Sequence, residues 1–89
     1  MRESTIEQKL CKRVEAKGGA AYKFVSPSHI GVPDRLLLYP IPPEYREIVA
    51  RYVRFVETKA PGKKPKPWQD REHKRLRKMG FVVEVLDHK

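Results

Sequence analysis

The stretch VRFVETKAPG, residues 53–62, combines an apolar segment with a carboxylate and an amine placed two positions apart. Its β-branched and aromatic residues predict a strand over residues 53–59, which Pro61 and Gly62 bring to an end. Side chains alternate between the two faces of a strand, so Glu57 and Lys59 point to the same side. The strand therefore carries an acid and a base on one face.

On both sides of this strand, helical and extended patterns alternate along the chain. The predicted elements are a helix from Ser4 to about Lys17, strands at Ala20–Val25 and Arg35–Tyr39, two helical turns within Glu44–Tyr52, a helix at Trp68–Met79 and a strand at Phe81–Leu86. This order predicts an α/β fold, a mixed four-stranded sheet flanked by helices. With 89 residues, the chain is expected to form a single domain over 1–89.

The first predicted helix has a start signal and a stop signal. Ser4 and Glu7 match a capping box, and Gly18 and Gly19 end the helix. One face is apolar, formed by Ile6, Leu10 and Val14. Glu7 falls within the same arc, so two roles stay open for it: a capping residue, or an acid directed inward.

In the helix predicted over 68–79, the apolar side chains Trp68, Leu76 and Met79 share one face. Core packing is the favoured role for Trp68, and stacking on a nucleic-acid base is the alternative. His73 lies on the flank of that face. Like His29 and His88, it lacks metal-ligand spacing and is expected at the surface.

Positive charge is concentrated in one part of the chain. The formal net charge is +9, and residues 59–78 hold nine basic residues against two acidic ones. This clustering favours a phosphate-binding surface over a merely solvated face. The expected DNA contacts are Lys63, Lys64, Lys66, Lys74, Arg75 and Lys78.

Two carboxylates lie at the ends of predicted strands, Asp34 and Glu57. Magnesium in proteins is usually held by one or two carboxylates together with water and substrate phosphate oxygens. A neighbouring lysine such as Lys59 would orient or deprotonate the attacking water. On their own, these residues are also compatible with an ordinary Pro-Asp turn and an exposed Glu-Lys pair on an edge strand.

Several linked motifs resemble the virus-type replication-repair nuclease (VRR-NUC) family of the PD-(D/E)xK nuclease superfamily. They are GVPDR at 31–35, FVETKAPG at 55–62, Gln69 in the following helix, YKF at 22–24 before Ser26-Pro27, and Gly80-Phe81 before the last strand. The resemblance covers nearly the whole chain, from about Glu3 to Asp87. It implies a restriction-endonuclease-like core with the element order αβββαβ.

The resemblance also implies a role for each site residue. Asp34 and Glu57 would hold Mg²⁺ or Mn²⁺, with the main-chain carbonyl of Thr58 as a third ligand. Lys59 would position the nucleophilic water, and Gln69 would support the site. Glu7 matches the glutamate that this superfamily often carries on its first helix, and Glu3 is the alternative for that position.

The expected activity is that of a structure-specific endonuclease in DNA repair, acting on branched DNA such as Holliday junctions. Two features depart from the family pattern: the insert Pro40–Tyr52 is longer than a simple hairpin, and the chain stops at Lys89, where relatives often continue into another helix. The insert carries an apolar stripe formed by Tyr45, Ile48, Val49 and Tyr52. This stripe, and a short chain that covers its sheet poorly, predict a homodimer.

Composition narrows the cellular compartments and functional classes that fit this chain. Cys11 is the single cysteine, which excludes an internal disulfide and favours a reducing compartment. Without a predicted membrane span or signal peptide, we expect a cytoplasmic protein in a bacterial-type or infected cell, neither secreted nor membrane-bound. Two alternatives stay open: a non-catalytic nucleic-acid-binding module, and a protein-interaction domain that uses the Pro40–Tyr52 segment.

Overall fold

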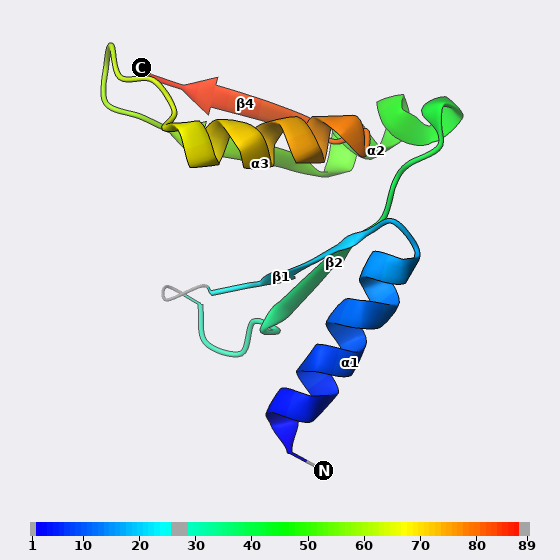
Figure 1. The fold of residues 1–89 in the computed structure, drawn as a ribbon. Helices are drawn as coiled ribbons and strands as arrows, with labels where there is room; N and C mark the ends of the chain where they lie inside the picture. The colour runs from blue at the N-terminus through cyan, green and yellow to red at the C-terminus, as the bar shows by residue number, and fades with distance from the viewer. Residues whose placement is uncertain (1, 26–28, 88–89) are drawn as a thin grey trace. The chain divides into compact units, whose positions relative to one another are not determined.

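A computed structural model describes residues 2–25 and 29–87 of the chain. They form two compact units, Met1–Pro40 and Ile41–Lys89, and each unit is described by itself (Figure 1). The single domain over 1–89 stays a prediction. Ser26, Pro27 and His88, which the sequence analysis singled out, lie outside the described residues.

The first unit is a helix packed on a strand pair. Helix α1 spans Glu3–Ala16, strand β1 spans Ala20–Lys23 and strand β2 spans Arg35–Leu38. The two strands are antiparallel, with Ala20 opposite Leu38 and Lys23 opposite Arg35. Among the described residues of this unit, the buried apolar side chains are Val14, Ala20 and Leu38. They join the end of α1 to the strands.

Two glycines make the tight connection between α1 and β1. Gly18 has a φ of +77°, a left-handed conformation that ends the helix, and the Gly19 N–H donates to the Val14 carbonyl at 3.0 Å. A Cβ atom at Gly19 would lie 2.5 Å from the carbonyl oxygen of Leu38. Glycine at this position therefore allows the end of α1 to approach the backbone of β2.

The beginning of α1 differs from the prediction. The helix starts at Glu3 after Arg2, and no side chain caps it. The Arg2 carbonyl accepts hydrogen bonds from the N–H groups of Thr5 and Ile6, so Ser4 already lies inside the helix. The predicted capping box of Ser4 and Glu7 is therefore wrong, and Glu7 has no capping role.

The second unit is built around a parallel strand pair joined by a helix. The elements are the 3₁₀ turn η1 at Pro43–Tyr45, helix α2 at Arg46–Tyr52, strand β3 at Arg54–Thr58, helix α3 at Pro67–Lys78 and strand β4 at Val82–Leu86. Arg54 pairs with Val82 and Thr58 with Leu86. Leu76, Met79 and Val83 are buried, and the Phe55 and Phe81 rings meet edge to face. This is a β-α-β unit, in which α3 provides the crossover that parallel strands require.

The α/β class is as predicted, but the sheet differs. The described strands form two two-stranded sheets, β1 with β2 and β3 with β4, where one four-stranded sheet was expected. Each strand pairs with its neighbour in sequence, either directly or across α3. The longest described helix, α1, has 14 residues, and none of the described helices is both long and apolar enough to span a bilayer.

Candidate functional site

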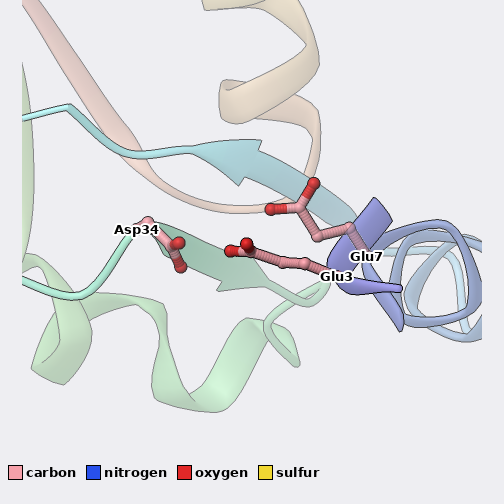
Figure 2. A group of neighbouring side chains, drawn as sticks. All are labelled: Glu3, Glu7 and Asp34. Carbon is pink, nitrogen blue, oxygen red and sulfur yellow. The ribbon is translucent and has the colours of Figure 1, made fainter. Parts of the chain in front are cut away.

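Three carboxylates gather at one place in the first unit. One carboxylate oxygen from each of Glu3, Glu7 and Asp34 lies within 4.8 Å of the other two, and Figure 2 shows the two glutamates extending from α1 on the side where Asp34 lies. Glu3 and Glu7 are one turn apart on α1, on the same side of the helix. Asp34 immediately precedes β2, and its carbonyl accepts a 2.8 Å hydrogen bond from the Phe24 N–H. Backbone structure thus fixes the position of all three residues.

One cation compensates part of this charge. The guanidinium Nη2 of Arg35 lies 3.3 Å from a carboxylate oxygen of Glu7. Arg35 follows Asp34 in the chain. The beginning of β2 therefore carries one negative and one positive side chain near α1. Three carboxylates and one guanidinium leave a formal charge of −2, which one divalent cation would neutralise.

The donor set of this cluster fits a hard divalent cation. All three side chains offer carboxylate oxygens, which are the ligands of Mg²⁺ and Mn²⁺, and none offers the nitrogen or sulfur that zinc or copper prefers. Glu3 and Asp34 are exposed and Glu7 is half-buried, so water and a phosphate group have access. Asp34 was predicted as a metal ligand, and Glu7 as the first-helix acid near the metal, with Glu3 as the alternative for that position; the structure brings both glutamates to Asp34.

In the second unit, the predicted Glu57 and Lys59 lie at the end of β3. Burial alternates along the strand: Glu57 and Lys59 are half-buried, whereas Val56 and Thr58 are exposed. This alternation places the acid and the base on the same side, as their spacing predicts. The Lys59 N–H donates to the Leu86 carbonyl at 2.8 Å, which extends the pairing with β4 past Thr58.

His73 of α3 is a neighbour of Glu57 that the sequence analysis missed. Its Nε2 lies 3.6 Å from a Glu57 oxygen, and the residue is 7% exposed, so the expectation of a surface histidine is wrong. Both side chains line a pocket of about 200 Å³, together with Phe55, Leu76 and Val83 among others. Gln69, His73 and Leu76 lie at positions i, i+4 and i+7, so they share one face of α3. This spacing is the signal that would have predicted a buried His73.

Gln69 has a structural partner in the loop before α3. Its side-chain oxygen accepts a 3.0 Å hydrogen bond from the Lys66 N–H, which is one half of a capping box. Pro67 occupies the first helical position, where its missing N–H costs no hydrogen bond. The side chain predicted to support the catalytic site therefore stabilises the beginning of α3.

The basic residues fall into two groups with different surroundings. Lys63, Lys64 and Lys66 are exposed in the loop between β3 and α3, which we call the basic loop, residues 60–66. The Lys63 N–H donates to the Ala60 carbonyl at 3.0 Å, and Gly62 has a φ of +79°; with Pro61 this is the pattern of a type II turn.

On α3, two of the predicted DNA contacts have acidic neighbours. Lys74 Nζ lies 3.2 Å from Asp70, and Arg75 lies 3.9 Å from Glu72. Lys78 is exposed near the end of the helix. The basic loop, by contrast, belongs to a stretch without Asp or Glu from Lys59 to Gln69.

The predicted site residues are therefore distributed over both units. Glu7 and Asp34 lie together in the first unit, and Glu57, Thr58 and Lys59 follow one another at the end of β3 in the second. Their roles in binding a metal and in catalysis stay predictions.

Comparison with known proteins gives a relative that matches almost the whole chain. A protein of Acyrthosiphon pisum secondary endosymbiont phage 1, named "Putative nuclease p44", is 49% identical over 87 residues, covering 98% of this chain and 84% of the phage protein. No family model matches the chain. No solved structure matches it either. The match extends over both units, and the chain belongs to the same protein family as this phage protein.

Proposed function

We propose that this protein is a nuclease that hydrolyses phosphodiester bonds of DNA with Mg²⁺ or Mn²⁺. The observation that carries the proposal is the cluster of Glu3, Glu7 and Asp34 in a chain whose net charge is +9. The name of the phage relative supports the nuclease class. The resemblance of the GVPDR and FVETKAPG motifs to VRR-NUC nucleases supports the metal-dependent reaction.

The charge distribution argues for a bridging cation. A protein that only binds nucleic acid gains affinity from its basic residues and loses it wherever a carboxylate faces a phosphate. Acidic groups at a phosphate site are repulsive unless a cation lies between them. The acid cluster is thus explained by a metal-dependent reaction and is unexplained in a non-catalytic binding module.

In the proposed reaction, Asp34 and Glu57 would hold the metal, with the Thr58 main-chain carbonyl as a further ligand. When bound, Mg²⁺ would stabilise charge on the phosphoryl group and lower the pKa of a water molecule. Lys59 would orient this water toward the phosphorus and contribute positive charge in the transition state. Glu7 completes the carboxylate set, and Gln69 stabilises the helix that follows the basic loop.

The proposed substrate is branched DNA, such as a Holliday junction, in a repair pathway, and the proposed working form is a homodimer. Within the insert, Tyr45, Ile48 and Tyr52 are 55%, 54% and 83% exposed, and Val49 is half-buried. Exposed apolar side chains at helical spacing are suited to pairing with a second copy. A two-fold dimer would present two active sites, which matches the two strands that are cut in a junction.

A cleavage panel tests the proposed reaction. Flaps, forks, four-way junctions and linear duplexes are incubated with the protein and Mg²⁺, Mn²⁺ or EDTA, and the products are separated on denaturing gels. We expect internal cuts that require the metal, with junctions cut fastest. Binding to all substrates without any cleavage would favour the non-catalytic module instead.

The oligomeric state is tested separately. Sedimentation at micromolar protein is expected to give twice the chain mass of 10.4 kDa. A mass equal to one chain would contradict the homodimer and leave the cleavage reaction untouched.

A further inference from the structure

The single tryptophan of the chain lies on the surface. Trp68 is 56% exposed in the first turn of α3, so the expectation that it packs in the core is wrong. The other two apolar residues of its predicted face, Leu76 and Met79, are buried as expected. An indole with this exposure contributes little to the core. Its apolar surface is unfavourable in water, and a binding partner that covers this surface removes that unfavourable free energy.

The surroundings of Trp68 are those of a phosphate-binding segment. It follows the basic loop directly, and Lys66 Nζ lies 5.2 Å from the centre of its ring, within cation–π range. Lys63 and Lys64 are exposed and precede Lys66 by three and two residues, with Pro65 between Lys64 and Lys66. Indole surface and amines thus lie together along one short, proline-stiffened segment.

Proteins that bind single-stranded nucleic acid combine these two elements. Positive side chains follow the phosphate backbone, while aromatic rings stack on bases that are not paired. In a duplex the faces of the bases are covered by their neighbours, so an exposed indole has a stacking partner only where the DNA is unpaired. The combination at residues 63–68 is therefore suited to unpaired bases.

We propose that Trp68 and Lys66 form a stacking platform for an unpaired nucleobase of DNA, with Lys63 and Lys64 binding the adjacent phosphates. The inference deepens the proposed function and rests on it: the substrate of the nuclease would contain a single-stranded or unpaired segment. Gln69, the next residue, holds the Lys66 backbone, so the first turn of α3 and the basic loop keep a fixed relation.

The test uses the full chain in EDTA, where no cleavage occurs, and the fluorescence of the single tryptophan. The ligands are a short oligothymidylate and an abasic oligonucleotide with the same number of phosphates. We expect oligothymidylate to quench the Trp68 emission and to bind more tightly than the abasic strand. Equal quenching and equal affinity for both ligands would overturn the proposal, because it would show that only phosphates are bound.

Substitutions provide the second arm of the test, measured by anisotropy of labelled strands. Trp68→Ala should weaken oligothymidylate binding roughly 5- to 150-fold, which corresponds to the loss of one stacked base. Binding of the abasic strand should stay unchanged, and Trp68→Phe should retain part of the affinity. Unchanged affinity of Trp68→Ala for oligothymidylate would overturn the proposal.

Val53→Ala is the control. Val53 belongs to the same unit, is 43% exposed and lies outside the apolar stripe of the insert. It immediately precedes β3, whereas the basic loop follows the other end of that strand. This variant should bind both strands like the wild type, and a loss equal to that of Trp68→Ala would contradict a specific platform.

A separate readout distinguishes this proposal from the proposed function. If oligothymidylate binds through Trp68 but no substrate is cut with Mg²⁺ or Mn²⁺, the platform is correct and the nuclease assignment fails. If substrates are cut and Trp68→Ala binds single strands normally, the nuclease assignment stands and the platform fails.

Discussion

The two units of this protein carry opposite kinds of charged site. In the first unit, residues 1–40, three carboxylates meet within 4.8 Å, and one guanidinium compensates them in part. In the second unit, residues 41–89, lysines follow one another through the basic loop and continue along α3. In the proposed function, cation binding belongs to a compact, folded cluster and phosphate binding to an extended segment.

The two sites also depend on the fold in different ways. The acid cluster exists only because α1 packs on the strands and brings Glu3 and Glu7 to Asp34, about 30 positions later in the chain. The basic loop is continuous in sequence and needs only a turn and a helix start to present its lysines. Changes in packing should therefore affect metal binding more than DNA binding.

The largest effect is expected from removing the proposed catalytic residues. Asp34→Ala, Glu57→Ala and Lys59→Ala should each lower the cleavage rate by roughly 10²- to 10⁴-fold, the usual contribution of a catalytic group. Quenched-flow or gel-based single-turnover rates with Mg²⁺ measure this, and circular dichroism checks the fold. Glu15→Gln, an exposed acid of α1 outside the cluster, is the control and should cut normally.

A second readout makes this prediction sharper. In EDTA, Asp34→Ala and Glu57→Ala should bind DNA at least as tightly as the wild type, since a negative charge facing phosphate has been removed. Near-wild-type cleavage by any two of the three variants would contradict the assignment of the site.

The next effect concerns the packing that builds the acid cluster. Gly19→Ala should lower the free energy of unfolding by about 3 kcal/mol, because its Cβ would lie 2.5 Å from the Leu38 backbone oxygen, which cannot move aside freely. Gly31→Ala is the control: its φ of +89° is also unfavourable for alanine, but its Cβ would meet nothing within 4 Å. There we expect a loss of about 1 kcal/mol. Urea unfolding of both variants measures the difference, and equal losses would refute the close-packing argument.

A smaller effect is expected on metal affinity. Glu3→Gln and Glu7→Gln should each weaken Mn²⁺ binding by roughly tenfold or more, since affinity for a hard cation depends on the number of charged oxygen ligands. Isothermal titration calorimetry without DNA gives the affinity, and Glu15→Gln again serves as the control. If both cluster variants bind Mn²⁺ like the wild type, the cluster does not hold the metal.

The smallest difference is expected between the two groups of basic residues. Replacing Lys63, Lys64 and Lys66 with alanine should flatten the dependence of log affinity on log salt by about 0.9 for each phosphate that the protein no longer neutralises. Replacing Lys74, Arg75 and Lys78 should flatten it less, because Asp70 and Glu72 already lie near two of these side chains. Equal slopes for the two triple variants would show that the acidic neighbours do not matter.

Much of the local structure could be predicted from the sequence. Apolar alternation and turn residues located both strand pairs and the helices to within a few residues, and the i, i+2 rule placed Glu57 and Lys59 on one side of β3. The motifs around Asp34 and Glu57 predicted a nuclease, and the name of the phage relative supports that class. These features depend on residues that are close in sequence, so they can be predicted from the sequence alone.

What only the tertiary structure decided is which side chains are covered and which distant ones meet. Periodicity gives the direction of Trp68 on α3 but not how far along the helix the core extends. The buried positions of α3 and its C-cap are His73, Leu76 and Met79, so the core does not reach the first turn, where Trp68 lies. Likewise, Glu3 joins Glu7 and Asp34 because α1 begins at Glu3 and lies against β1. Burial and proximity depend on packing between elements, and packing depends on how the elements fit together in space, which local sequence patterns do not show.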